Sequence, residues 1–244
     1  MTAALKALVW DVDGTLAETE RDGHRVAFNR AFADAGLPWH WDEAQYGELL
    51  GVTGGKERLL SWWRRVDPTA AAGPGVQERI AQWHALKTRH YEALVASGAV
   101  ALRPGVEDLL RAARAEGLAL AIATTTQPAN VQALLGHTLG ADAIGWFSCI
   151  GAGDVVPHKK PAPDIYLWVL QRLGLAPREV LALEDSAPGV GAARAAGIPV
   201  VAVRSAYTRD DDLSGALVEF GSLVDVDLAG LRRLHGRAAA APVG

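Results

Sequence analysis

The chain opens with an apolar run that stops at a cluster of acids. Residues 5–10 are almost all hydrophobic and have strand length, and Asp11-Val12-Asp13-Gly14-Thr15 follows directly. This pattern predicts a buried parallel strand that ends in a tight turn. Ligands of open α/β sheets lie beyond the carboxyl ends of the strands, so a functional site is first expected here. A surface turn after an ordinary strand is the alternative, because Asp and Gly are also common turn residues.

The pattern then becomes helical for roughly eighty residues, in four successive stretches with apolar side chains at three- and four-residue spacing. Gly36 is a plausible stop for the first stretch, and Pro68 ends the third. Asp42, with Gln45 three residues later, is typical of a helix N-terminus at the second stretch. Four consecutive helices between strands predict an inserted helical domain over residues 17–100.

From Leu102 onward, strands and helices alternate, which predicts a parallel sheet joined by right-handed crossovers. The sequence therefore predicts an α/β fold: a Rossmann-like parallel-sheet core, residues 1–16 and 101–244, with an inserted helical cap domain, residues 17–100. Residues 236–244 are expected to form a frayed tail. Beyond the first strand, further strands are predicted at residues 118–123, 146–150, 180–183 and 198–203, and helices at residues 106–115 and 161–173.

Four of these strands are followed by polar side chains. These are Asp11 and Asp13 after the first, Thr124 after the second, Lys159 and Lys160 after the third, and Glu184, Asp185 and Ser186 after the fourth. In a parallel sheet these ends share one edge. The carboxylates of Asp11, Asp13 and Asp185 would then need a cation to neutralise them, and carboxylates combined with phosphate and water suit Mg²⁺. Lysine, a hydroxyl and turn N–H groups suit a phosphoryl group.

Each member also has a structural interpretation. Asp185 and Ser186 are compatible with a helix N-cap, Lys160 with an exposed loop lysine, and Thr124 with a β-branched residue that completes its strand. Gly189, Gly191 and Gly197 superficially match a dinucleotide-binding motif, but the spacing fails.

Composition limits the classes of partner. The chain of 244 residues carries 24 basic and 28 acidic residues, so its net charge of −4 provides no broad field for nucleic acid or an anionic membrane. Cys149 is the only cysteine, which excludes an intramolecular disulfide. No apolar stretch reaches membrane-spanning length, and the N-terminus lacks a secretory pattern. We therefore expect a cytoplasmic monomer that binds a small molecule.

The polar segments resemble the four motifs of the haloacid dehalogenase superfamily, in order and over nearly the whole chain up to Tyr207-Thr208. A helical insertion directly after the first motif resembles the subgroup with a mobile cap, which includes β-phosphoglucomutase, phosphoglycolate phosphatase and the CbbY-type sugar-bisphosphate phosphatases. Further segments look most like the CbbY type, whose members dephosphorylate xylulose-1,5-bisphosphate, an inhibitor of the carbon-fixing enzyme Rubisco. The motif segments are residues 11–15, Thr124, residues 160–164 and residues 183–186, and the CbbY-like segments are residues 19–20, 24–29, 53–58 and 123–126.

The resemblance implies a role for each core residue. Asp11 would be the nucleophile that forms an aspartyl-phosphate, and Asp13 the general acid and base, which requires an environment that holds its pKa up. Mg²⁺ would be bound by Asp11, the backbone carbonyl of Asp13 and Asp185, with assistance from Glu184. Thr124, the N–H of Thr125 and Lys160 would hold the phosphoryl oxygens, with Lys159 as the alternative lysine.

The resemblance also implies that the cap selects the substrate. Glu20, His24 and Tyr46 are expected to face the sugar hydroxyls, while Lys56, Arg58 and Lys87 are candidates for a distal phosphate. A solvated helix face for Arg58 and a packed polar role for His24 are the alternatives. One departure is an extra residue within Arg21-Asp22-Gly23, which leaves the placement of Glu20 open.

The expected function is a Mg²⁺-dependent phosphatase for a small phosphorylated sugar, with xylulose-1,5-bisphosphate as the leading substrate. A β-phosphoglucomutase-like phosphomutase and a phosphoglycolate phosphatase are the alternatives. A catalytically idle binding protein on the same scaffold is disfavoured, because every core position carries a competent residue type.

Overall fold

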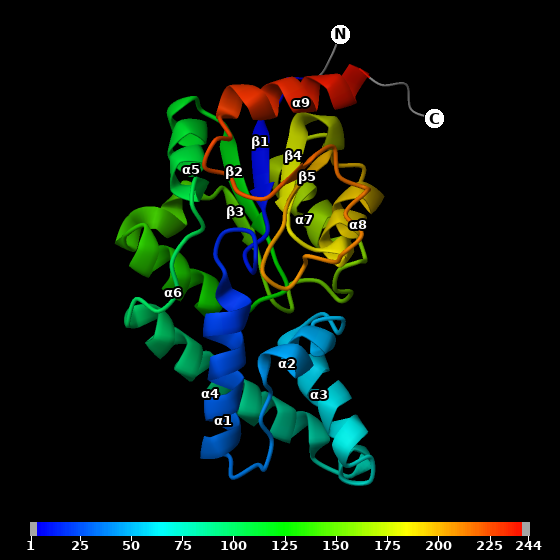
Figure 1. Cartoon of the computed structure of the whole chain (residues 1–244). Coiled ribbons are helices and arrows are strands. Elements are labelled where there is room, and N and C mark those ends of the chain that lie inside the picture. The colour runs from blue at the N-terminus through cyan, green and yellow to red at the C-terminus, as the bar shows by residue number, and fades with distance from the viewer. Residues whose placement is uncertain (1–3, 241–244) are drawn as a thin grey trace.

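A computed structural model describes residues 4–240. Within them a six-stranded sheet runs in the order β3-β2-β1-β4-β5-β6, and every neighbouring pair is parallel. Helices cover both faces of the sheet (Figure 1), which confirms the predicted Rossmann-like parallel-sheet fold. The strands are β1 Ala7–Trp10, β2 Ala119–Ala123, β3 Cys149–Gly151, β4 Val180–Glu184, β5 Val200–Val203 and β6 Glu219–Phe220.

Side-chain alternation in β1 divides the core between the two faces of the sheet. Leu8 and Trp10 belong to one buried cluster, with side chains of α5 and α6, whereas Ala7 and Val9 belong to another, with side chains of α7 and α8. This follows from the two-residue period of a strand, which sends successive side chains to opposite faces. The α-helices that follow residue 100 are α5 Val106–Ala115, α6 Pro128–Thr138, α7 Asp164–Leu173, α8 Ala187–Ala195 and α9 Leu228–Ala240.

A group of helices lies beyond the carboxyl ends of the strands, in the lower half of Figure 1. It contains the π-helix Glu20–His24 followed by α1 Arg25–Asp34, then α2 Glu43–Leu49, α3 Gly55–Val66 and α4 Val76–Ala96. We call residues 17–100 the helical segment. Its buried cluster is largely aromatic and includes Phe28, Phe32, Trp41 and Trp63.

The local signals in this segment behave as predicted. The Asp42 side chain accepts a hydrogen bond of 2.8 Å from the Gln45 N–H and so caps α2. Gly36, with a φ of +66°, follows α1. Within residues 4–240, no helix combines the length and the apolar character needed to cross a bilayer.

Some predicted boundaries were wrong. The third strand starts at Cys149 instead of at residue 146, because Ala141–Trp146 forms a 3₁₀ helix and Trp146 contacts the guanidinium of Arg114. The helix predicted from residue 161 begins at Asp164, after the turn that contains Pro161 and Pro163.

The C-terminal part departs most from the prediction. β6 is too short, at two residues, for its period to be visible in the sequence. Residues 236–240 of the predicted frayed tail belong to α9, which is anchored by the buried Leu228 and Leu231. The rest of that predicted tail lies outside the described residues.

Candidate active site

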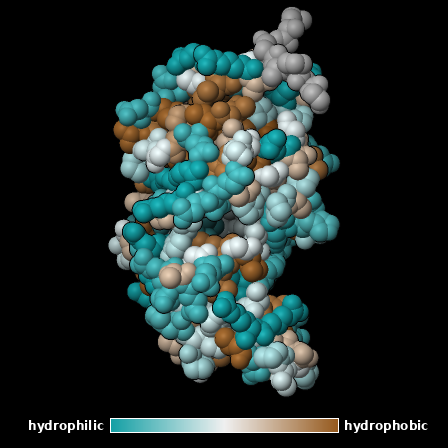
Figure 2. Space-filling model, turned by 45° about the vertical axis from the view of Figure 1, so that its right-hand side comes forward, coloured by the Kyte–Doolittle hydropathy of each residue, from teal (hydrophilic) through white to brown (hydrophobic). Residues whose placement is uncertain are grey.

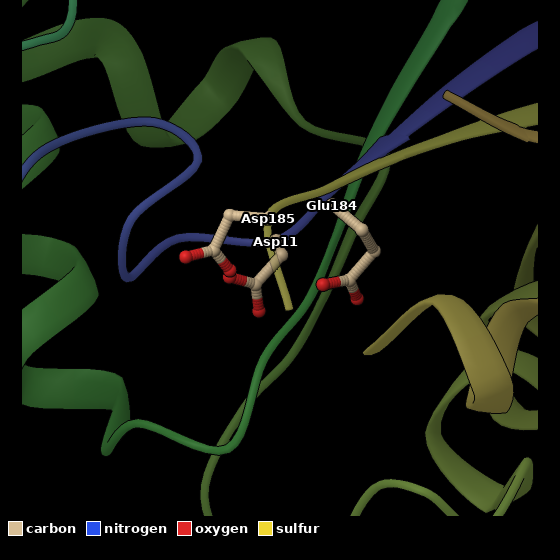
Figure 3. Close-up of side chains that lie close together, drawn as sticks. All are labelled: Asp11, Glu184 and Asp185. Carbon is tan, nitrogen blue, oxygen red and sulfur yellow. The ribbon is translucent and has the colours of Figure 1, made fainter. Parts of the chain in front are cut away.

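Three carboxylates and an ammonium group meet at the carboxyl edge of the sheet. Lys160 Nζ lies 2.6 Å from Asp11 Oδ1 and 2.6 Å from Glu184 Oε1. Asp11, Glu184 and Asp185 each offer an oxygen within 4.8 Å of the others, and all three are buried. In Figure 3 the carboxylates of Asp11 and Asp185 point toward one another, with Glu184 beside them.

Neighbouring strands and two glycines create this arrangement. β1 and β4 run side by side, and the Asp11 N–H donates to the Leu183 carbonyl at 3.0 Å. A Cβ atom at Gly14, whose φ is +83°, would lie 2.0 Å from Asp185 Oδ2, and one at Gly189 would lie 1.9 Å from Glu184 Oε2. Gly14 is therefore required both by its left-handed backbone and by the space that Asp185 occupies.

The electrostatics of this cluster show excess negative charge. Burial raises the pKa of Asp11 from 3.8 to about 8, even though Lys160 acts in the opposite direction. Burial, together with the charge of Asp11, raises the pKa of Asp185 well above its ordinary value. Burial alone would lower the pKa of Lys160, but the charges of Asp11 and Glu184 outweigh it, and the pKa lies above its ordinary value.

The donor set fits a hard divalent cation. All the available ligands are oxygens, and Glu184 Oε2 is buried without a hydrogen-bond partner among the described residues. Unpaired buried carboxylate oxygens are costly unless a cation or a proton satisfies them. Mg²⁺ prefers such oxygen ligands.

The structure separates the two adjacent lysines. Lys160 is buried against Asp11 and Glu184, whereas Lys159 donates to the Gly153 carbonyl and, at 2.8 Å, to Asp154. Tyr166, from the buried side of α7, donates its hydroxyl to Glu184 Oε1. Lys160 is therefore the lysine that faces the acidic cluster.

The carboxylate of Asp13 lies in a second network. Asp13 Oδ1 is 2.5 Å from the Thr19 hydroxyl and 2.8 Å from His24 Nε2, and His24 Nδ1 is 2.7 Å from Lys87 Nζ. An ammonium group can only donate, so His24 Nδ1 accepts and Nε2–H donates to Asp13. Lys87 therefore holds His24, and not a free anion, in this conformation.

The pKa of Asp13 is shifted in the direction opposite to our expectation. Burial raises it, but His24 and the hydrogen bond from Thr19 lower it by more, to about 2. Asp13 is therefore a carboxylate in this conformation, and not the protonated acid that its expected role as a general acid requires. The sequence pattern could not reveal this, because Thr19 and His24, 6 and 11 positions from Asp13, reach its carboxylate only through the fold.

Further predicted side chains of the helical segment form a third network. The Tyr46 hydroxyl donates to Glu20 Oε2 at 2.5 Å and accepts from Arg58 Nη1 at 2.9 Å. Arg58 is buried, so the alternative of a solvated helix face for it was wrong. Lys56 lies apart from this network and pairs with Asp154, at 2.5 Å.

Members of each network line a cavity of about 290 Å³, and the surface is hollowed where the helical segment meets the core (Figure 2). Asp11, Asp13, Lys160 and Asp185 line it from the core, and Glu20 and Arg58 from the helical segment. Thr125 lines it too. Thr124 is not among its lining residues, and the Thr124 hydroxyl accepts the Thr126 N–H at 3.3 Å.

Sequence reasoning missed the part of the cavity wall that follows β5. Ser205, Tyr207, Thr208 and Asp211 all line the cavity. Ligands are expected beyond the carboxyl ends of parallel strands, and this expectation also holds for β5, because β5 ends at the same edge of the sheet as the other strands. Polar residues after the fifth predicted strand were therefore a usable signal.

Known proteins resemble this chain over most of its length. A family model described as haloacid dehalogenase-like hydrolase matches residues 5–197. Protein CbbY, plasmid, of Cupriavidus necator is 49% identical over 247 residues, covering 95% of this chain and 97% of that protein. Protein CbbY of Rhodobacter capsulatus is 52% identical over 212 residues, covering 87% of this chain and 91% of that protein.

Solved structures agree with these sequence matches. A mutant of CbbY from Rhodobacter sphaeroides, in complex with xylulose-(1,5)bisphosphate, superposes with a TM-score of 0.85 and 44% identity, covering 93% of this chain and 99% of that one. A β-phosphoglucomutase from Clostridium difficile, at 20% identity and a TM-score of 0.79, shares the fold. The superfamily resemblance inferred from the four motifs is confirmed.

Proposed function

Because the chain belongs to the haloacid dehalogenase-like hydrolase family, we propose that it is a Mg²⁺-dependent phosphatase whose preferred substrate is xylulose-1,5-bisphosphate. The observation that carries the proposal is the buried contact of Lys160 with Asp11 and Glu184, at the floor of a cavity lined by two parts of the chain. The substrate is proposed from the relative that is 44% identical and is described in complex with that compound.

Asp11 is the proposed nucleophile. Its carboxylate oxygen would bond to phosphorus while the bond from phosphorus to the sugar oxygen breaks, which gives an aspartyl-phosphate. Two displacements then replace one very slow hydrolysis. Lys160, Thr124 and the N–H of Thr125 would hold the phosphoryl oxygens. Mg²⁺, bound by Asp11, Asp185 and the Asp13 carbonyl with Glu184 assisting, would supply positive charge to offset the carboxylates and the phosphate.

Asp13 is the proposed general acid and base. In the observed conformation Asp13 Oδ1 accepts hydrogen bonds from Thr19 and His24, the form suited to deprotonating the water that attacks the aspartyl-phosphate. The earlier transfer of a proton to the leaving sugar oxygen requires these contacts to change when substrate enters. Because Lys87 Nζ contacts His24 Nδ1, a movement of Lys87 would act on the hydrogen bond between His24 and Asp13.

The helical segment, residues 17–100, is proposed to be the cap. It lines the cavity opposite the core and would exclude water when closed. Glu20 and Tyr46 would face the sugar hydroxyls together with His24. Arg58 is the strongest candidate for a distal phosphate, because Arg58 lines the cavity while Lys56 contacts Asp154 and Lys87 contacts His24.

A kinetic comparison with Mg²⁺ present tests this proposal. Phosphate release is measured from xylulose-1,5-bisphosphate, ribulose-1,5-bisphosphate, β-glucose-1-phosphate and phosphoglycolate, with the first expected to have the highest kcat/KM. Turnover of phosphoglycolate without turnover of either ketose bisphosphate would reject the substrate. Isomerised sugar phosphate without free phosphate would identify a phosphomutase instead. Light scattering tests the monomeric state, which we also propose.

A further inference from the structure

Arg103 lies where the chain returns from the helical segment to the core, between α4 and α5. Its side chain is 9% exposed, and its guanidinium donates to three backbone carbonyls. The acceptors are those of Gly14, of Val203 at 3.1 Å and of Arg204 at 2.6 Å. Arg103 Nε also lies 3.5 Å from Glu18 Oε1.

The three carbonyls belong to two strand ends that are not neighbours. Gly14 follows β1, Val203 ends β5, and β4 lies between those strands in the sheet. The guanidinium therefore connects the two segments on either side of the strand that leads to Asp185. A planar fork with five donors can make several such bonds in fixed directions, whereas a lysine ammonium is a point charge.

The Gly14 turn and the residues after β5 pack around the Asp185 side chain. A Cβ at Gly14 would lie 2.0 Å from Asp185 Oδ2 and 3.1 Å from the Cβ of Ser205, which follows Arg204. Gly14 also follows Asp13 directly in the chain. Any shift of the Gly14 peptide would therefore move the Asp13 backbone and open or close the space around the Asp185 carboxylate.

Arg103 also joins the two links to the helical segment. Its N–H donates to the Leu16 carbonyl at 2.8 Å, and the preceding Leu102 forms an antiparallel bridge with Ala17. The polypeptide chain passes between the core and residues 17–100 only at these two links. A movement of the helical segment relative to the sheet would act on the Gly14 turn at this point.

We propose that Arg103 is a positioning residue, which holds the Asp13-Gly14 turn and the end of β5 at a fixed separation around Asp185 while the helical segment moves. The role in turnover rests on the proposed phosphatase function, but the role in holding Asp185 does not. Arg103 contacts no reacting atom, and it acts through the positions of the Asp13 and Asp185 carboxylates.

Chemical rescue tests the proposal. A cavity of about 410 Å³, lined by Glu18, Arg103 and Arg204 among others, lies beside the guanidinium and gives a small cation access to it. Arg103→Ala should lower kcat by about 100-fold, the cost expected for a misplacement of about 1 Å, with KM changed by less than about threefold. Guanidinium chloride at concentrations of about 10–50 mM, far below those that unfold proteins, should restore part of kcat, and ammonium chloride should not.

Two further variants separate positioning from folding. Arg232→Ala removes an arginine of α9 that bonds to Glu116 at 2.9 Å, and its kcat should be unchanged, with or without guanidinium. Arg103→Lys keeps the positive charge and should fold if Arg103→Ala does not, but its kcat should stay at least about tenfold low because the fork is lost. Wild-type kcat in Arg103→Lys or in Arg103→Ala would overturn the proposal.

Mg²⁺ binding provides a measurement that does not depend on turnover. Calorimetric titration with MgCl₂ should show affinity for Arg103→Ala at least about fivefold weaker than for the wild type, since a displaced ligand weakens a metal site. Equal affinities would contradict the positioning of Asp185. If the wild type releases no phosphate from any substrate, the proposed function fails while this titration still tests Arg103.

Discussion

Replacing Lys160 by methionine probes the central contact of the site. The ammonium group lies 2.6 Å from both Asp11 Oδ1 and Glu184 Oε1, and the three side chains are at most 9% exposed. Removing one partner of a buried ion pair costs about 3–5 kcal/mol, because the remaining charge stays desolvated. We expect about 3 kcal/mol, at the lower end, because the raised pKa of Asp11 lets it take up a proton in place of the lost ammonium.

The neighbouring lysine is a matched control. Lys159→Met removes the same charge one position away, from contacts with Gly153 and the half-exposed Asp154. The Asp154 carboxylate of this pair is open to solvent, and pairs at the surface contribute about 0–1 kcal/mol, so this variant should remain close to the wild type in stability. Urea unfolding in the presence of EDTA measures both, and Lys160→Met should lower the midpoint by about 1 M or more.

Two further measurements separate stability from chemistry. Lys160→Met should reduce kcat by about 10²–10³-fold, as removal of one charge-stabilising donor does. Its affinity for Mg²⁺ should equal or exceed that of the wild type, because the deleted group is itself a cation. A loss of stability in Lys159→Met as large as in Lys160→Met, or full kcat in Lys160→Met, would refute the reasoning.

Three other substitutions test separate features. Asp11→Asn should abolish phosphate release yet keep the fold and the urea midpoint, since burial already favours a neutral group at this position. Phosphate release at the wild-type rate would contradict the covalent mechanism. Gly14→Ala places a Cβ 2.0 Å from Asp185 Oδ2 at a φ of +83° and should weaken Mg²⁺ binding in calorimetry, whereas Gly36→Ala, also at positive φ but with open space around it, should not. Burial lowers the pKa of His84 from 6.5 to about 3, so His84 binds its proton more readily in the unfolded chain, and its own contribution to stability rises with pH between these values. That contribution is about 2 kcal/mol less favourable at about pH 5 than at pH 8, whereas the raised pKa of Asp11 acts in the opposite direction. Urea unfolding of the wild type and of His84→Gln should therefore show a stability difference that shifts by about 2 kcal/mol between these two pH values, and a constant difference would show that His84 does not contribute.

The amino-acid pattern predicted most of the strands and helices and the sheet edge at which the polar residues meet. Strand-length apolar runs followed by Asp11, Lys160 and Asp185 predicted a parallel sheet whose carboxyl ends converge, and the described residues form that sheet. This was possible because strand period and turn chemistry are local properties, and a parallel sheet brings its strand ends together whatever the loops do.

The pairing of polar groups, in contrast, is a product of folding. Lys56 contacts Asp154, 98 positions away, Lys87 contacts His24, and Arg103 reaches the carbonyls of Gly14 and Arg204. No periodicity marks such contacts, because a long side chain selects its partner among groups that only folding brings within reach. The pKa of Asp13 is set by its contacts with His24 and Thr19, which also form only on folding, so its protonation was beyond the sequence although its place in the site was not.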